Sequence, residues 1–359
     1  MSGGRRRAPS PSAEPSVATP LPAAGRASRS PAILNRGTRL ALSLVLLTGA
    51  VVYAGGPRAI LAPLASASLP WIVGSLVVAT LDRALMVAKW AYLLRAQDQS
   101  LPLFEGLRIY CSAMLHGMVL PSTVGADALR IYHVVRRGLR SETVVASVVV
   151  ERLQGFVASL LVGLAGFWVL DTQGLLDARF ETMGKIGAAV VAAATALVIL
   201  SMWERPFQAV VHALPARVAR SRLVARLAGV QQSYVRFGAR PGVLAVFFAL
   251  TVCEQLVSIV YCWFTALAVG ADVSLWFMAG VLPLTLLVSR LPISFDGLGV
   301  FEAVFIALMA LGDIDPAQAT SIALLGRILQ TASWVPWSIA HSLETPGAPG
   351  PEPVAVEGD

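Results

Sequence analysis

Charged side chains are scarce in this chain of 359 residues. Asp, Glu, Lys and Arg make up 14% of it, whereas hydrophobic residues make up 56% and the mean hydropathy is +0.70. A soluble domain carries about a quarter charged residues. The composition therefore argues against an ordinary soluble domain and predicts a membrane protein.

Cysteine is also rare, and the common catalytic motifs are missing. Cys111, Cys253 and Cys262 stand in apolar surroundings, with no Cys-x-x-Cys and no histidine at ligand spacing. We expect buried apolar residues there, not disulfides or a structural metal, and we expect no cofactor. The chain has no P-loop, no H-E-x-x-H, no G-x-S-x-G and no G-x-G-x-x-G before a strand. It is therefore not expected to be an enzyme.

One short acidic motif needs a separate interpretation. Asp313-Ile314-Asp315 has the D-x-D form of metal-dependent glycosyltransferases. However, Asp315-Pro316-Ala317-Gln318 fits the start of a helix better, with an N-cap aspartate, a proline at the first position and a glutamine at the third. The motif therefore favours a helix start over a catalytic site.

The net charge of +7 lies mainly in loops and in the N-terminal segment. Basic residues are not interleaved on a soluble face, so nucleic acid is not an expected partner. Residues 1–36 are rich in Ser, Pro, Ala and Arg, which predicts a disordered basic cytoplasmic tail. Its arginine run is not followed by an apolar core suited to a twin-arginine signal. Residues 344–359 are predicted to form a disordered acidic tail.

Long apolar runs fill residues 37–343 and predict a single transmembrane domain. The segment 104–120 is short and carries Arg108 and His116, which favours a re-entrant helix over a full span. The fold class is therefore an all-α polytopic integral membrane protein, with about eight transmembrane helices and two re-entrant or broken elements that form an internal repeat. The expected spans are 39–55, 69–94, 142–170, 184–203, 241–269, 272–289, 299–312 and 317–342.

Basic residues predict the orientation. The segment 205–240 contains seven arginines and no acidic residue, and other arginines flank the segment 104–125. The positive-inside rule places these residues in the cytoplasm, so 104–125 must enter and leave by one face. Both termini are then cytoplasmic, in the inner (cytoplasmic) membrane.

Within 205–240, apolar residues recur at steps of three and four, from Leu223 to Phe237. This spacing predicts a basic amphipathic helix lying on an anionic leaflet. The alternative is a charged loop that only sets the topology.

Two breaks interrupt the apolar pattern in the same way. LPSTVGADALR at 120–130 and RLPISFDGLGVFEA at 290–303 each combine proline, glycine and a carboxylate. After each break, a predicted apolar helix carries an arginine eleven residues from its start, Arg152 after Ser141 and Arg327 after Pro316. We therefore predict two copies of one unit. Paired broken helices are the best sequence indicator of a transporter's binding site.

Such breaks are tolerated at membrane depth only inside protein or beside a watery cavity. A helix that restarts there points its positive end, which suits an anion, into the cavity. An arginine at a helix centre costs about 2.5–3.5 kcal/mol, so carboxylate partners are expected. The alternatives are helix capping and structural ion pairs. The candidate translocation site comprises Pro121, Gly125, Asp127, Arg130, Glu151, Arg152, Pro292, Ser294, Asp296, Gly297, Gly299, Glu302 and Arg327.

These segments resemble the lysylphosphatidylglycerol synthase transmembrane family over roughly residues 40–342. The family pattern P-x-x-x-G-G-D-x-x-R is matched by Pro121, Gly125, Asp127 and Arg130, with Ala126 in place of the second glycine. The pattern P-I-S-x-G-G-L-G-x-x-E is matched with Asp296 in place of a glycine; its matching residues are Pro292, Ile293, Ser294, Gly297, Leu298, Gly299 and Glu302.

The resemblance implies translocation of a lipid between leaflets. Membrane lipids, with an anionic headgroup, are then the expected partners, and lipid-synthesis enzymes are further ones. Because the chain ends at Asp359, we expect no soluble aminoacyl-transferase domain and no synthase activity. Two alternatives stay open: a membrane enzyme acting on a polyprenyl- or glycan-linked lipid, with Asp127, Asp296 or Glu302 as acid or base, and a scaffold in envelope synthesis.

Overall fold

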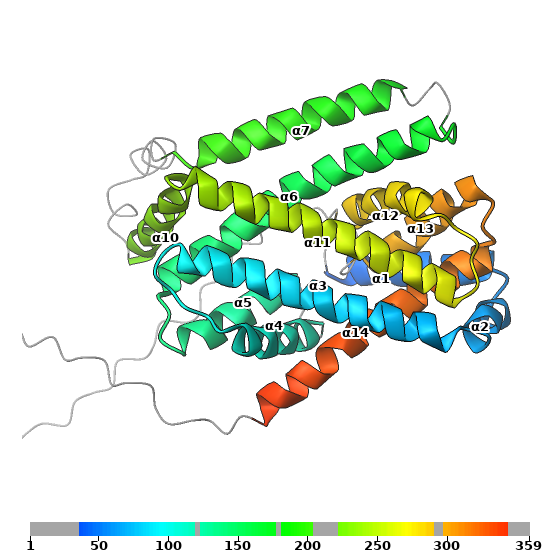
Figure 1. The fold of residues 1–359 in the computed structure, drawn as a ribbon, viewed down its shortest axis with the longest axis horizontal. Coiled ribbons are helices and arrows are strands. Elements are labelled where there is room, and N and C mark those ends of the chain that lie inside the picture. The colour runs from blue at the N-terminus through cyan, green and yellow to red at the C-terminus, as the bar shows by residue number, and fades with distance from the viewer. Residues whose placement is uncertain (1–35, 119–122, 177–180, 204–221, 291–296, 344–359) are drawn as a thin grey trace, which may run out of the picture. The chain divides into compact units, whose positions relative to one another are not determined.

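The computed structural model describes residues 36–118, 123–176, 181–203, 222–290 and 297–343. The chain divides into two units, 1–35 and 36–359, and all described residues belong to the second. Every regular element among them is helical (Figure 1). The helices are α1 (Arg36–Tyr53), α2 (Pro57–Ala65), α3 (Leu69–Arg95), α4 (Leu103–Gly117), α5 (Thr123–Val135), α6 (Ser141–Thr172), α7 (Glu181–Ser201), α10 (Arg222–Gly238), α11 (Pro241–Ala268), α12 (Leu275–Ser289), α13 (Val300–Met309) with the short 3-10 helix η2 (Ala310–Gly312), and α14 (Pro316–Ser342).

Four of the described helices, α3, α6, α7 and α11, are long and apolar enough to cross a membrane. The pair α1 and α2 is a fifth candidate span, bent by 72°. By contrast, α12 has 15 residues and α13 has 10, and a full crossing of about 30 Å needs about 20. The predicted count of eight full spans is therefore not confirmed, because α12 and α13 are short and α14, the predicted span 317–342, is not among these candidates.

The helices α12 and α13 instead form an antiparallel hairpin. The Phe277 ring near the start of α12 lies against Gly312 just after α13, and Ser289 at the end of α12 lies against Gly297. The helices α4 and α5 make a second hairpin, because Arg137 pairs with Glu105 at one end and Gly117 contacts Ala126 at the other. Each hairpin therefore enters and leaves at one end of the molecule, the geometry predicted for 104–125.

The helices α3 and α11 run antiparallel along each other (Figure 1). The Ser68 N–H donates to the Ala268 carbonyl at one end, and Arg240 donates to the Ala96 carbonyl at the other. Each of these helices begins a series of a long helix, a hairpin and another long helix. The first series is α3 to α6 and the second is α11 to α14. Because their first helices are antiparallel, the two copies form an inverted repeat.

The packing follows this pseudo-twofold symmetry and exchanges the hairpins between the copies. The helix α12 packs on α6 of the first copy, and α4 packs on α14 of the second. Glycines allow the first contact, since a Cβ on Gly166 would lie 2.9 Å from the Ala279 carbonyl oxygen and one on Gly280 would lie 2.5 Å from Leu170. Small residues of this kind let membrane helices approach closely. Each long helix thus holds the hairpin of the other copy.

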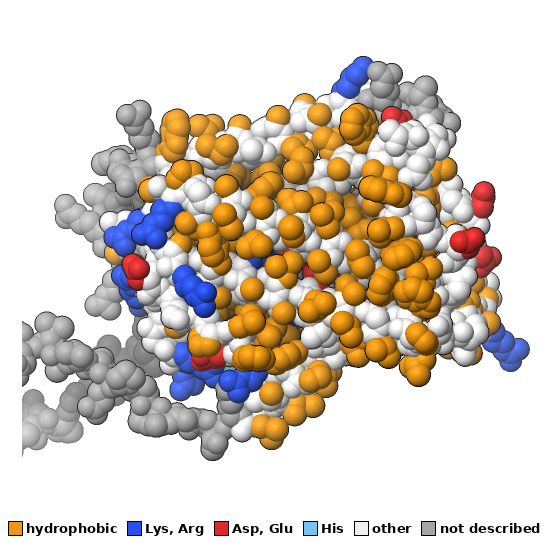
Figure 2. Space-filling view, viewed as in Figure 1, with side chains coloured by type: hydrophobic (Ala, Val, Ile, Leu, Met, Phe, Trp, Pro, Cys, Tyr) orange, Lys and Arg blue, Asp and Glu red, His pale blue; other side chains and the backbone are white. Residues whose placement is uncertain are grey.

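The two ends of the helical bundle differ in charge. In Figure 2, Lys and Arg gather at the end where α10 and the α4–α5 hairpin lie, Asp and Glu gather at the opposite end, and apolar side chains cover the surface between them. We call these the basic end and the acidic end. The acidic end includes Asp171, Asp272, Asp313 and Asp315, with Arg58 and Lys185 as cations. A wide apolar band between two polar ends is the surface of a membrane protein.

The helix α10 confirms the predicted helical periodicity within Arg222–Gly238. Its arginines Arg226 and Arg236 are exposed, whereas Tyr234 and Phe237 are buried in a cluster with side chains of α3, α6 and α11. The apolar stripe predicted to lie on lipid is therefore partly covered by protein. Leu227, which is 49% exposed, is left to contact a leaflet.

Candidate functional site

The first hairpin joins α6 through a two-point ion pair. Arg152 donates from Nε to Asp127 Oδ2 at 2.9 Å and from Nη2 to Oδ1 at 2.7 Å. Asp127 lies on α5, one residue after the close contact of Ala126 with Gly117. Its carboxylate is nearly buried, whereas the Arg152 side chain is 53% exposed. The arginine is thus fixed at its inner side and open on its outer side.

The second hairpin joins α14 through the corresponding pair. Arg327 Nη2 lies 3.2 Å from Glu302 Oε1, and Glu302 is fully buried while Arg327 is 34% exposed. Glu302 Oε2 also accepts the Gly299 N–H at 2.6 Å at the start of α13. Gly299 has a φ of 80°, and a Cβ there would lie 2.7 Å from the Ser43 carbonyl oxygen. Gly297 has a φ of 72°. Glycine at both positions is required by the backbone that presents Glu302.

The two pairs occupy equivalent places. Asp127 and Arg152 are separated by 25 residues, as are Glu302 and Arg327. Each arginine lies eleven residues, or about 16 Å, along its long helix. Because the copies are inverted, α6 and α14 start from opposite ends of the bundle, and each arginine lies about 16 Å from the start of its helix toward the other end. The expectation that each arginine has a carboxylate partner matches this geometry.

Arg130 and Glu151 make a separate buried pair. Arg130 is fully buried and donates to both Glu151 oxygens at 2.9 and 3.1 Å; its Nη2 also lies 3.0 Å from Asp127. The guanidinium lies over the rings of Trp90 and Tyr110, 4.9 and 5.4 Å from their centroids. The partner of Glu151 is therefore Arg130 and not Arg152, so this pair supports Asp127 instead of facing an open cavity.

The remaining predicted residues divide into two groups. Gly125 is buried on α5, two residues from Asp127. The other four, Pro121, Pro292, Ser294 and Asp296, lie outside the described residues. The predicted set therefore gathers around two equivalent pairs, one on each hairpin.

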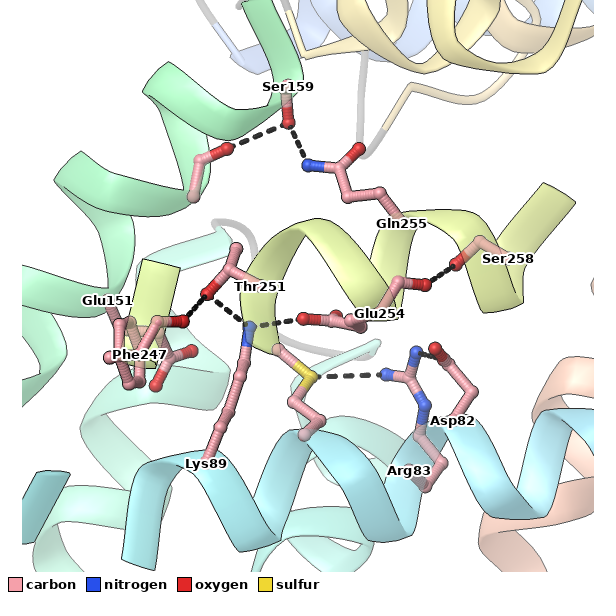
Figure 3. A network of polar contacts seen from close by, with 12 residues as sticks. Asp82, Arg83, Lys89, Glu151, Ser159, Phe247, Thr251, Glu254, Gln255 and Ser258 are labelled. Atoms are coloured by element: carbon pink, nitrogen blue, oxygen red, sulfur yellow. Dashed lines mark hydrogen bonds and ion pairs between the residues drawn. The ribbon is translucent and has the colours of Figure 1, made fainter. Parts of the chain in front are cut away.

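A third group of charges was not predicted. Asp82, Arg83 and Lys89 lie on α3, and Glu254 lies on α11 (Figure 3). These residues are ionisable side chains inside apolar spans, which marks a functional candidate in a membrane helix. That signal was available in the sequence of 69–94 and 241–269. Among the residues that the structure describes, no three His, Cys, Asp or Glu side chains are grouped as metal ligands.

An apolar groove adjoins Arg327. It has a volume of about 640 Å³ and lies between α1, α2 and α14, with Val51, Ile60, Leu64 and Ile328 in its wall. Arg327 is the one charged side chain among its lining residues in the described part of the chain. A larger apolar cavity of about 1140 Å³ lies between α6, α7, α10 and α11.

Comparison with protein families agrees with this architecture. The model of the lysylphosphatidylglycerol synthase TM region matches residues 38–337. No curated protein matches the chain. No solved structure matches it either. Because the family match covers most of the chain, this protein belongs to the lysylphosphatidylglycerol synthase TM region family, a family of membrane domains.

Proposed function

We propose that this member of the family moves a lipid with an anionic headgroup between the two leaflets. One observation carries the proposal: the inverted repeat places two partly exposed arginines, Arg152 and Arg327, at equivalent positions within its long helices, each fixed by a hairpin carboxylate. An exposed guanidinium within an apolar membrane helix is unfavourable unless water or an anion solvates it. A lipid phosphate passing between the leaflets supplies such an anion.

The arginines keep hydrogen-bonding capacity for a headgroup. Arg has five N–H donors in a planar fork that suits phosphate oxygens. Among the described residues, Arg327 donates one hydrogen bond, to Glu302. Arg152 gives two of its donors to Asp127. The carboxylates therefore orient the guanidinium groups and leave donors on their exposed sides.

The apolar groove beside Arg327 suits the other half of such a ligand. A lipid needs a polar point for its headgroup and an apolar wall for its chains. The groove between α1, α2 and α14 offers both, since Arg327 lies in a wall of aliphatic side chains. A free anion would make no use of that wall, which favours a lipid.

Transport fits the geometry better than catalysis at the same residues. Asp127 and Glu302 each accept hydrogen bonds from an arginine, so both carboxylates are engaged in positioning a guanidinium group. The inverted repeat gives equivalent half-sites from opposite ends, the usual construction of alternating-access transporters. We place the basic end, and with it both chain termini, on the cytoplasmic side of the inner membrane by the positive-inside rule.

The test is lipid movement in reconstituted vesicles. Fluorescent phosphatidylglycerol in phosphatidylcholine vesicles is quenched from outside by dithionite, so the quenched fraction reports movement between leaflets. The protein should raise that fraction from about half toward completion, and R152Q with R327Q together should abolish the increase. Mass spectra of the lipid before and after should be identical. Unchanged quenching with folded wild-type protein, or a changed lipid mass, would overturn the proposal.

A further inference from the structure

The contact between α3 and α11 contains ionisable groups that the proposed lipid site does not use. Figure 3 shows Lys89 extending from α3 toward Glu254 and Thr251 on α11. Asp82 and Arg83 lie nearer the start of α3. Asp82 and Lys89 are buried, at 3% and 2% exposure. The side chain of Glu254 is 15% exposed. The group lies on the two helices that relate the copies to each other.

The repeat makes two of these residues equivalent. Asp82 lies thirteen residues after Leu69, where α3 begins, and Glu254 lies thirteen residues after Pro241, where α11 begins. Thirteen residues span about 20 Å of helix, which is close to the middle of either helix. Because α3 and α11 are antiparallel neighbours, the inverted repeat places one carboxylate from each copy at the centre of the interface between the copies.

Both carboxylates take their charge partners from α3. Lys89 Nζ donates to Glu254 Oε2, lies 3.3 Å from Thr251 Oγ1 and lies over the Phe247 ring. Arg83 pairs with Asp82 Oδ2. The other oxygen of Asp82, Oδ1, is buried without a hydrogen-bond partner among the described residues. An acceptor left in this state is costly, and a bound proton converts it into a donor or a neutral group.

Other charged and titratable groups also face the pair. Arg83 interacts electrostatically with Glu254 as well as with Asp82, and Arg290, at the end of α12, interacts with Glu254 and Arg152. Arg83 also interacts electrostatically with Tyr110 and Cys111 on α4 and with Tyr261 on α11. Among the described residues, no three His, Cys, Asp or Glu side chains are grouped as metal ligands, so the ligand considered for these two carboxylates is the proton.

We propose that Asp82 and Glu254 bind and release the protons that couple lipid movement to a proton gradient, an inference that rests on the proposed function. When Glu254 takes up a proton from water on one side, an O–H bond forms and the ion pair with Lys89 is lost. The bound proton adds one positive charge to the protein, and the anionic headgroup at Arg152 and Arg327 balances it. Release of the proton to the other side restores the pair. Each proton that crosses in this way is therefore accompanied by one negative charge.

The experiment imposes a pH gradient on proteoliposomes that contain fluorescent phosphatidylglycerol and an entrapped pH dye. For wild type, the gradient should accelerate lipid movement in one direction at least tenfold, and the dye should report protons entering with the lipid. A sodium gradient at constant pH should have no effect. E254Q should lose the response to the pH gradient and still exchange lipid without one. E254D, which stays titratable, should keep the response.

Matched variants separate coupling from a structural role. T251V removes a contact of Lys89 but no titratable group, and it should respond to the gradient like wild type. The double variant K89M/E254Q replaces the ion pair with uncharged groups. If the pair only stabilises the fold, this double variant regains the gradient response; if Glu254 carries the proton, the response stays lost.

The outcomes for the two proposals differ. Lipid movement by wild type at the same rate with and without a pH gradient overturns proton coupling and leaves the proposed function standing. A response to sodium instead of pH overturns it as well. If wild type moves no lipid under any condition, the proposed function itself fails, and coupling fails with it.

Discussion

The two inverted copies carry the same carboxylate–arginine pair but support it differently. In the first copy, the buried Arg130–Glu151 pair stands behind Asp127, beneath the rings of Trp90 and Tyr110. In the second copy, the positions equivalent to Arg130 and Glu151 are Phe305 and Gly326, and the Gly299 N–H binds Glu302 instead. Both copies thus keep the partly exposed arginine and its carboxylate, and they differ in the residues that hold that carboxylate in place.

The largest effect expected from this difference concerns the first copy alone. E151Q removes the bidentate partner of the fully buried Arg130 and leaves the contact with Asp127, and breaking a buried ion pair costs about 3–5 kcal/mol. We expect a strongly lowered thermal midpoint in detergent, measured by fluorescence scanning. The double variant R130M/E151L removes both charges and should recover most of that loss. A midpoint for E151Q equal to wild type would show that Asp127 alone supports Arg130.

The support in the second copy can be broken through its backbone. G299A places a side chain at a φ of 80° and 2.7 Å from the Ser43 carbonyl oxygen, so α13 must shift away from α1. Strain of this kind costs about 1–3 kcal/mol. The control is G155A, because Gly155 lies within α6 with nothing near its Cβ position, and there alanine should raise the midpoint slightly. Equal midpoints for the two variants would mean that Glu302 is positioned without Gly299.

Several of these features could be predicted from the sequence, and others depend on packing between distant segments. Arg152 and Arg327 in apolar helices predict carboxylate partners, and the two breaks contain Asp127 and Glu302. However, Glu151 and Asp127 both lie before Arg152 in the sequence, and either one could be its charge partner. Only the docking of α5 on α6 decides that Arg152 meets Asp127 while Glu151, turned about 100° around the helix, meets Arg130.

The predicted count of eight spans is not confirmed for a related reason. The runs 272–289 and 299–312 are apolar enough to cross a membrane, and composition does not record that the chain reverses near Gly297. The inversion of the repeat was also hidden, since the direction of a copy depends on how α3 and α11 pair. Once the copies are aligned on those helices, the equivalence of Asp82 and Glu254 is visible in the sequence. The two breaks and the helices that follow them predict the repeat but not this equivalence.

The smallest effect compares the exposed arginines with each other. R152K and R327K keep the positive charge but lose the planar fork that binds a carboxylate and a phosphate together. Because the two arginines are equivalent by symmetry, we expect each change to slow lipid movement by about tenfold, which corresponds to about 1.4 kcal/mol. Stability should change little, since both side chains are partly exposed. Dithionite quenching in vesicles measures both variants under the same conditions. If R152K slows movement and R327K does not, the half-sites are unequal and the lipid contacts the first copy alone; such a result would confine the translocation path to the side of the α4–α5 hairpin.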